Sequence, residues 1–319
     1  GSSYPDTYPV VSGEIVGCLR LVDILYATSD GSKGFDDTTN PDGVYKVWAS
    51  RNLLFPESES KTDNFTIEAA LATLNVAKFY DANANGEDDD GQYITGWKVN
   101  IGGGLDQDDF TPVTISLAPG DYDVSEYAPL ESNWMATTPT SVGVTLSAGE
   151  SESVGFGNLC LGEGGGKTRG FWGSKNGEAL FGDDDRALMV SLSLRNADGT
   201  DFDPANYDDF ETWLQGANAT NMAYMLSAQL AAMELNVLNG MVDWNALVYA
   251  PGTTSANPLG FARIHDLMAE ADAELAAHDL ALDGSPHRSY QEALKDALDD
   301  ANNNRSFVQP TPCPFSFSD

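Results

Sequence analysis

A short acidic segment, residues 81–92, restricts the fold of this chain more than any other part of the sequence. Side chains that carry oxygen atoms stand at alternate positions: Asp81, Asn83, Asn85 and Asp89. Gly86 lies among them, where a loop that folds back on itself needs a residue without a side chain. Calcium binds six to eight oxygen ligands at short range, so this segment predicts a calcium site.

The predicted ligands are Asp81, Asn83, Asn85, Glu87 through its backbone carbonyl, Asp89 and Gln92, with Asp88 or Asp90 in reserve. An EF-hand loop has a bidentate glutamate at its twelfth position and a helix on each side. Here Gln92 holds the twelfth position, and the apolar run before the loop, residues 74–80, is typical of a strand. We therefore expect a calcium site of moderate affinity at the edge of a β-domain. The alternative is an acidic turn that binds no ion.

The charge balance excludes several classes of partner. The 319 residues include 16 Lys and Arg against 49 Asp and Glu, which gives a net charge of −33. Nucleic acids and anionic membranes are bound through basic surfaces, so neither is expected as a partner. The sequence has no apolar run of about 18 residues, and we expect no membrane insertion. The acidic excess fits cation binding, a solvated acidic surface, or both.

The length allows two or three domains. Residues 1–66 form a β-rich N-terminal part, with its clearest strand at 44–49. Residues 67–160 contain short predicted strands separated by Gly, Pro and Asp turns, which is typical of a small β-sandwich. A polar loop in the first part offers a second candidate calcium site, with an ordinary turn as the alternative. Its residues are Asp36, Asp37, Asn40 and Asp42.

The pattern changes after residue 160. Residues 161–170 are rich in glycine and predict a flexible linker, and residues 171–319 predict an all-α helical bundle. Five helices are expected, near 177–195, after Pro204, over 220–240, over 258–279, and from 285 to 302. The helix over 220–240 is apolar on nearly every side, so we place it at the centre. The expected fold class is multidomain α+β, a β-sandwich followed by helices.

The cysteines indicate where the protein functions. A disulfide between Cys160 and Cys313 would close the C-terminal part of the chain. Cys18 is then left over, either buried as a small apolar side chain or paired with another chain. Calcium binding together with a disulfide indicates an extracellular location, secreted or at the cell surface.

Several motifs resemble one known family. They occupy residues 78–86, 96–101, 117–126, 137–146 and 154–158. In this order they resemble the SdrD B-like and Cna-B-type domains, over about residues 67–160. The resemblance implies a prealbumin-like, immunoglobulin-like β-sandwich of a secreted or surface protein. It also implies that Asp81, Asn83, Asn85 and Asp89 bind calcium, whereas Gln92 departs from the family pattern.

Some Cna-B-type domains also contain an isopeptide bond between a lysine and an asparagine, assisted by a buried glutamate. By this resemblance the three residues would be Lys78, Asn158 and Glu126. The chemistry requires a lysine that burial keeps neutral. Calcium-binding relatives usually lack the bond, so both outcomes stay open.

The helical part gives weaker signals. Residues 168–177 are similar to the Thr-x-Gly-Phe/Tyr-Trp element that opens helical modules of bacterial secreted proteins, and Phe171 and Trp172 are expected to anchor it. No catalytic constellation stands out, so we expect no enzyme. The histidines are His265, His278 and His287. The first two are too far apart in sequence to form a metal pair on one helix.

These features predict a non-enzymatic structural protein outside the cell, with a calcium-stiffened sandwich. We expect it to self-assemble as a homo-oligomer or homopolymer, as in a filament or matrix, with residues 1–12 donating a strand to a neighbour. The alternative is a calcium-dependent adhesin or carbohydrate-binding module at the cell surface. Its glycan or surface partner would contact exposed Trp97 or Trp134.

Overall fold

The computed structural model describes residues 70–318 in full and, among residues 1–69, only the backbone of five strands. Cys18 and the candidate second calcium loop at 36–42 lie outside the described residues. The chain divides into two compact units. The first comprises residues 1–74, 114–122 and 144–152, and the second comprises residues 75–113, 123–143 and 153–319.

The N-terminal strands of the first unit pair locally. Strand β1 (Val10–Val11) is antiparallel to β2 (Glu14–Ile15). Strands β3 (Ile24–Thr28), β4 (Gly43–Ser50) and β5 (Ser60–Ile67) form an antiparallel sheet in chain order. The strand expected at 44–49 lies within β4.

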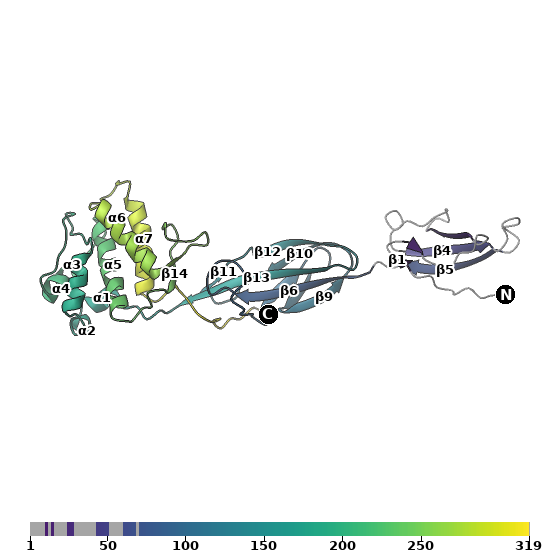
Figure 1. The fold of residues 1–319 in the computed structure, drawn as a ribbon, viewed down its shortest axis with the longest axis horizontal. Coiled ribbons are helices and arrows are strands. Elements are labelled where there is room, and N and C mark those ends of the chain that lie inside the picture. Colours follow the sequence, from purple (N-terminus) through teal and green to yellow (C-terminus); the bar gives the residue numbers. More distant parts are fainter. Residues whose placement is uncertain are drawn as a thin grey trace. The chain divides into compact units, whose positions relative to one another are not determined.

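Residues 72–162 form two β-sheets (Figure 1). The first sheet has the order β12 (Ser141–Leu146), β10 (Gly120–Glu126), β7 (Lys98–Ile101) and β8 (Gln107–Phe110). The second contains β13 (Ser151–Gly162), β6 (Ala72–Tyr80) and β9 (Val113–Leu117), and β11 (Trp134–Ala136) pairs with β13. These strands follow the spacing expected from the sequence.

The alternation of side chains along β6 explains why this segment is a strand with one buried face. Leu74, Val76 and Lys78 are almost completely buried, whereas the residues between them are partly exposed. A period of two places one set of side chains in the space between the sheets. Val99 and Val124 of the other sheet are also buried there. The result is a two-layered β-sandwich.

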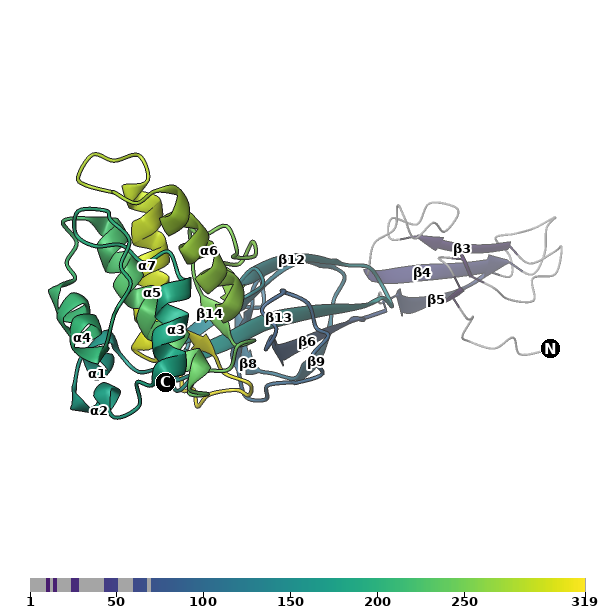
Figure 2. The same ribbon diagram turned by 60° about the vertical axis from the view of Figure 1, so that its left-hand side comes forward.

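Helices follow the sandwich, and Figures 1 and 2 show α5 running beside α7. The helices are α1 (Arg169–Trp172), α2 (Lys175–Glu178), α3 (Asp183–Ser191), α4 (Tyr207–Gly216), α5 (Met222–Leu238), α6 (Ile264–Ala277) and α7 (Arg288–Asn302). Most residues of α5 are buried, as its apolar sequence predicts. Among the described residues, no helix is both long enough and apolar enough to cross a membrane.

The expectation that the chain beyond residue 160 is all-α is wrong. Three short strands occur there: β14 (Leu247–Tyr249), β15 (Phe261–Arg263) and β16 (Phe307–Val308). They extend the sandwich sheet in the order β15-β14-β16-β13. Strand β13 continues to Gly162, and its backbone pairs with Val308 and Phe307. A strand edge presents unpaired N–H and C=O groups, and the short strands satisfy them.

The glycine-rich segment is packed rather than free. A side chain at Gly164 would overlap the ring of Phe307, and one at Gly165 would overlap the carbonyl of Met241. The side-chain amide of Asn236 on α5 binds the backbone of Lys167 through two hydrogen bonds. Its Oδ1 accepts the backbone N–H of Lys167, and its Nδ2 donates to the carbonyl of the same residue. These glycines therefore permit close approach of the backbone to the helices.

The structure contains the predicted disulfide between Cys160 and Cys313, at a sequence separation of 153. The C-terminal tail, residues 309–318, returns to the sandwich through further contacts. Leu130 N–H donates to the carbonyl of Ser316 at 2.9 Å, and Ser316 Oγ donates to Glu131 at 2.7 Å. The helices thus lie within one long loop that the disulfide closes.

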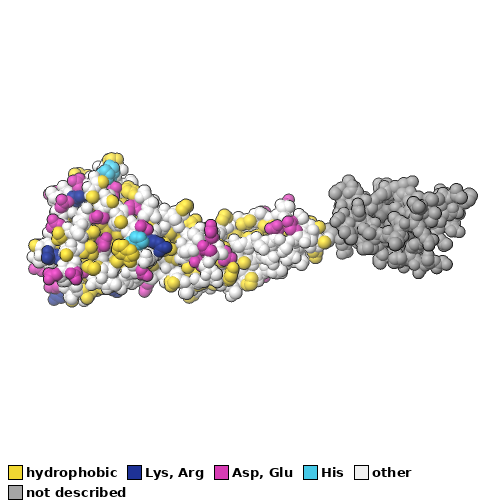
Figure 3. Space-filling model, viewed as in Figure 1, with side chains coloured by type: hydrophobic (Ala, Val, Ile, Leu, Met, Phe, Trp, Pro, Cys, Tyr) yellow, Lys and Arg dark blue, Asp and Glu magenta, His cyan; other side chains and the backbone are white. Residues whose placement is uncertain are grey.

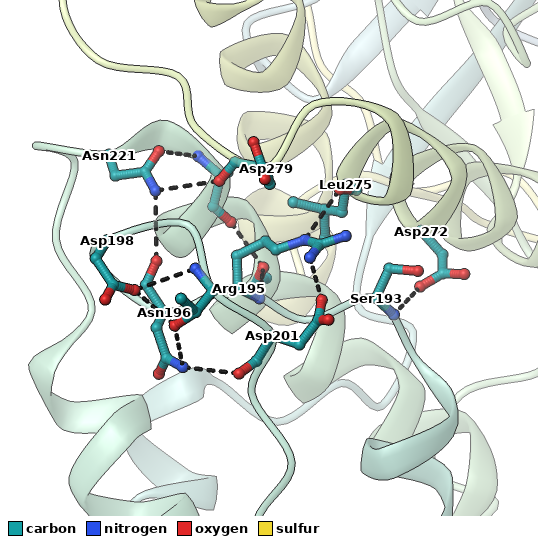
Figure 4. Close-up of polar contacts among 12 residues, drawn as sticks. Ser193, Arg195, Asn196, Asp198, Asp201, Asn221, Asp272, Leu275 and Asp279 are labelled. Carbon is teal, nitrogen blue, oxygen red and sulfur yellow. Dashed lines mark hydrogen bonds and ion pairs between the residues drawn. The ribbon is translucent and has the colours of Figure 1, made fainter.

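A half-buried acid on α5, Glu234, gives the helical part a pH dependence. Burial, and to a lesser extent the negative charge of Asp272 on α6, together raise the pKa of Glu234 from 4.5 to about 7. Asp272 is held in place because it accepts the backbone N–H of Ser193 at 2.6 Å (Figure 4). Glu234 therefore binds a proton more tightly in the folded chain than in the unfolded chain.

Protonation of Glu234 stabilises the folded chain. We expect this contribution to the free energy of unfolding to be complete below about pH 4.5 and to be lost as the pH rises through about 7. Glu234→Gln should match wild type in thermal unfolding at about pH 4, below the pKa of the unfolded side chain. At pH 8 it should be more stable by on the order of 1 to 3 kcal/mol. Glu292→Gln, at an exposed position of α7, is the matched control and should show no such difference. An equal effect of Glu234→Gln at both pH values would contradict the assignment.

Candidate calcium site and a buried lysine–glutamate pair

The predicted calcium loop begins where β6 ends, and backbone hydrogen bonds close its base. Tyr80 N–H donates to the carbonyl of Gln92 at 2.7 Å, and Ile94 N–H donates to the carbonyl of Lys78 at 2.8 Å. Gly86 has φ of +81°, a conformation that costs glycine little and other residues more. The sharp turn predicted at this glycine is therefore present.

Five side chains of the loop converge: Asp81, Asn83, Asn85, Asp89 and Asp90. The amide of Asn83 donates to Asp89 at 2.9 Å and to Asp90 at 3.2 Å. The amide of Asn85 donates to the other oxygen of Asp89 at 2.9 Å. Among the predicted reserve ligands, Asp90 joins this group, whereas Asp88 accepts a hydrogen bond from the Tyr93 hydroxyl.

Asp81 gives the strongest reason to expect a cation. Its side chain is completely buried, and its two oxygens accept the backbone N–H groups of Asn85 and Gly86. In the part of the chain that is fully described, no Lys, Arg or His forms an ion pair with it. A buried carboxylate without a positive partner is costly, and a bound calcium ion would supply the missing charge.

The two remaining predicted ligands are Gln92 and the backbone carbonyl of Glu87. The side chain of Gln92 is directed to the tail, since its Nε2 donates to the carbonyl of Pro310 at 3.4 Å. Glu87 is exposed, and its backbone N–H donates to the amide oxygen of Asn85. No three carboxylates of the loop bring one oxygen each within 4.8 Å of one another, so amide and backbone oxygens must complete any calcium cage.

The loop also contacts the helical part of the same compact unit. The amide of Asn257 donates to the carbonyl of Ala84 at 2.6 Å. A side chain at Gly86 would lie 3.1 Å from the carbonyl of Thr137 and 3.7 Å from Leu259. The conformation of the loop is thus coupled to both the sandwich and the segment before β15.

Lys78 and Glu126 form an ion pair in the sandwich interior. Their side chains are 0% and 2% exposed, and the Lys78 ammonium lies 4.5 Å from the ring centre of Trp97. Burial lowers the pKa of Lys78 to about 8, although the charge of Glu126 opposes this shift. Burial also raises the pKa of Glu126. Both groups are therefore brought closer to a neutral state than they would be in water.

Asn158 on β13 belongs to the same interior. The residue is 4% exposed, and the oxygen of its side-chain amide, Oδ1, has no hydrogen-bond partner among the described residues. Its backbone carbonyl accepts the N–H of Asp81, which fixes this part of β13 beside the end of β6. Each of the three residues that the family resemblance selected is therefore buried.

The tryptophans expected to contact a glycan are buried, so that expectation is wrong. Trp97 is 0% exposed and Trp134 is 9% exposed. The tail covers them, with the ring centre of Phe315 4.9 Å from that of Trp97 and 5.9 Å from that of Trp134. Sequence could not show this cover, because the tail lies about 180 residues beyond Trp134 and still further beyond Trp97.

A shallow pocket of about 670 Å³ lies beside α4, and three carboxylates line it, those of Asp198, Asp203 and Asp209. Its wall includes Asp198, Trp213 and Tyr224. Hydrogen bonds from Thr200 lower the pKa of Asp198, which is the behaviour of a turn residue. Glu234, whose pKa is raised, does not line the pocket. Figure 4 shows the neighbouring loop, in which Arg195 pairs with Asp201.

Comparisons with known proteins give only remote similarities. No protein-family model matches the chain, and no curated protein matches it. Similar solved structures include GBS52, the minor pilin of Streptococcus agalactiae, at 15% identity, covering 40% of this chain and 65% of that one with a TM-score of 0.23. A streptococcal ancillary pilin matches at 15% identity, over 39% and 47% of the two chains, with a TM-score of 0.24.

The Bacillus anthracis TIE protein matches at 9% identity, over 46% of this chain and 33% of that one, with a TM-score of 0.27. The matched region is less than two thirds of each of these three chains. TM-scores this low do not define a shared fold, so these similarities support no conclusion about function.

We expect calcium to raise the midpoint of thermal unfolding of the wild-type protein, and a chelator to reverse the effect, because binding to the folded chain alone stabilises it. Asp89→Asn should weaken the calcium response and Asp81→Asn should abolish it. Glu292→Gln removes an equal charge at an exposed position of α7 and should respond as wild type does. Differential scanning calorimetry with calcium or chelator makes the comparison. Equal calcium shifts in Asp81→Asn and wild type would refute the site.

Proposed function

We propose that this protein is a secreted or cell-surface structural protein without enzymatic activity. Calcium stiffens its prealbumin-like sandwich, and the helical part is displayed from that sandwich. The observation that carries the proposal is the return of the C-terminal tail to the sandwich, where Cys313 is bonded to Cys160 at the end of β13.

This connection determines which parts of the chain bear tension. A pull between β6 and the tail passes through the pairing of β6 with β13 and then through the disulfide. The helices between residues 160 and 313 lie outside that path. A helical module can therefore be held away from load while the sandwich transmits it, which suits a surface scaffold. The disulfide also fits an oxidising location outside the cytosol.

The buried trio of Lys78, Glu126 and Asn158 would strengthen the same path. The neutral amine of Lys78 would attack the side-chain carbonyl carbon of Asn158. Glu126 would take a proton from the amine and deliver one to the leaving nitrogen, so that an amide bond forms and one ammonia departs. Burial favours this step because it raises the fraction of neutral lysine. The product would join β6 to β13 covalently.

Intact mass spectrometry tests the cross-link. We expect wild-type protein to be lighter than its sequence mass by one ammonia, after allowance for the disulfide. Lys78→Met and Glu126→Gln should each have the full mass of their sequence. Lys98→Met is the matched control, because Lys98 lies in the same sandwich but pairs with exposed Asp108, and it should keep the loss. Wild-type protein that has its full sequence mass, without the loss of one ammonia, would exclude the bond.

Self-assembly is the second part of the proposal. An N-terminal segment that adds a strand to the sheet of a neighbouring copy would give a homopolymer. Electron microscopy of the whole protein with and without calcium tests this. We expect filaments or large oligomers that calcium stabilises, and monomers after deletion of residues 1–12. A deletion of residues 1–4 serves as the control. Assembly that survives the longer deletion would contradict strand donation, and a monomer under all conditions would contradict assembly altogether.

A further inference from the structure

Two histidines and a glutamate meet where α6 ends and α7 begins. Glu274 and His278 are one helical turn apart at the end of α6, and His287 immediately precedes α7. One ligand atom from each of the three lies within 4.8 Å of the others. In the described part of the chain, this is the only such group of three formed by His, Cys, Asp or Glu.

The spacing of the group is close to that of a coordination shell. Nδ1 of His287 lies 3.9 Å from Oε1 of Glu274. Two ligands at about 2.1 Å from a tetrahedral ion are roughly 3.4 Å apart. The rings of His278 and His287 are stacked, with centres 3.4 Å apart and planes 15° from parallel. Lone pairs of stacked rings do not converge, so binding one ion requires a rotation of the rings about χ2.

Both ends of the group are fixed by other parts of the chain. Figure 4 shows the hydrogen bonds that hold the end of α6, where Arg195 donates to the carbonyl of Leu275 at 3.1 Å and Asn221 donates to that of Asp279. Arg288, the first residue of α7, donates to the carbonyl of Ala281 at 3.0 Å. The backbone that carries the three ligands is thus held in place before any ion binds.

The buried side-chain amide of Gln291 forms hydrogen bonds to two members of the group. Gln291 is 0% exposed, and its Nε2 donates to Oε1 of Glu274 at 3.3 Å and to the carbonyl of His278 at 2.8 Å. Its own Oε1 has no hydrogen-bond partner among the described residues. Partners that orient metal ligands in this way tune metal affinity. Gln291 therefore positions both the carboxylate and the turn that carries His278.

We propose that Glu274, His278 and His287 form a binding site for a divalent transition metal of the Zn²⁺ class. Two imidazoles and one carboxylate match the ligand preference of zinc, whereas calcium prefers oxygen ligands alone. Three protein ligands leave one coordination position for water. The side chain of His287 is 42% exposed, and Figure 3 shows histidine atoms at the surface of the helical part. The bound ion would fasten the start of α7 to the end of α6.

The test titrates zinc sulfate into the full chain by calorimetry, in millimolar calcium chloride so that oxygen-rich sites are already occupied. We expect one zinc ion per chain in wild-type protein. His278→Gln and His287→Gln should each weaken binding by at least about 100-fold, since each removes a direct ligand, and Gln291→Met should weaken it by about 10-fold. His265→Gln is the matched control, because the third histidine stacks on Trp244 and lies outside the group.

The proposal is supported if affinity falls in this order while His265→Gln binds as wild type does. It is overturned if wild-type protein binds no zinc under these conditions. It is also overturned if the double variant of His278 and His287 still binds one ion with wild-type affinity. Glu274→Gln provides an independent variant if a histidine substitution impairs folding. Cobalt substitution offers a second readout, because its visible absorption should change when a histidine ligand is lost.

Discussion

The attachment of the C-terminal tail to β13 is the interaction on which the rest of the arrangement depends. A disulfide that closes a loop of 153 residues contributes about 5 kcal/mol in the loop-entropy view, by restricting the unfolded chain. The same attachment brings Phe315 and Phe317 onto Trp97, with ring centres 4.9 and 5.3 Å away. Each such aromatic contact contributes about 0.5 to 1.5 kcal/mol beyond burial. The tail therefore completes the hydrophobic core at this end of the sandwich.

Buried polar groups occur where distant segments must meet in one register. Asn236 accepts the indole N–H of Trp172 at 3.0 Å and donates to Asn302 on α7 at 2.9 Å. Asn302 in turn donates to both the backbone and the side chain of Gln229. A network of this kind is stable only when each member has its partners, so it selects one packing of α5 against α7. The Lys78–Glu126 pair has the same consequence between the two sheets of the sandwich.

Local patterns predicted much of the fold. The apolar run over residues 74–80, the turns between the sandwich strands and the apolar sequence of α5 each depend on neighbouring residues, and each matched the structure. The predicted helix over 258–279 begins only at Ile264, because residues 261–263 pair as β15. The glycines at 164 and 165 suggested a flexible joint, but their neighbours Phe307 and Met241 come from far along the chain. Both errors arise where a distant segment overrides a local preference.

The residues of the candidate sites also fall into two groups, those that local sequence selects and those that only distant contacts bring together. The sequence by itself determined the loop of Asp81, Asn83, Asn85 and Asp89, because its alternating oxygen ligands and its glycine are local features of one turn. It also selected Cys160 and Cys313, since these two cysteines bracket the C-terminal part of the chain. Only the tertiary structure decided that Gln92 points away from this loop and that Trp97 and Trp134 are covered by the tail. Likewise, His278 and His287 meet only because the connection between α6 and α7 folds back on itself. Such contacts depend on how remote segments pack, and no local pattern contains that information.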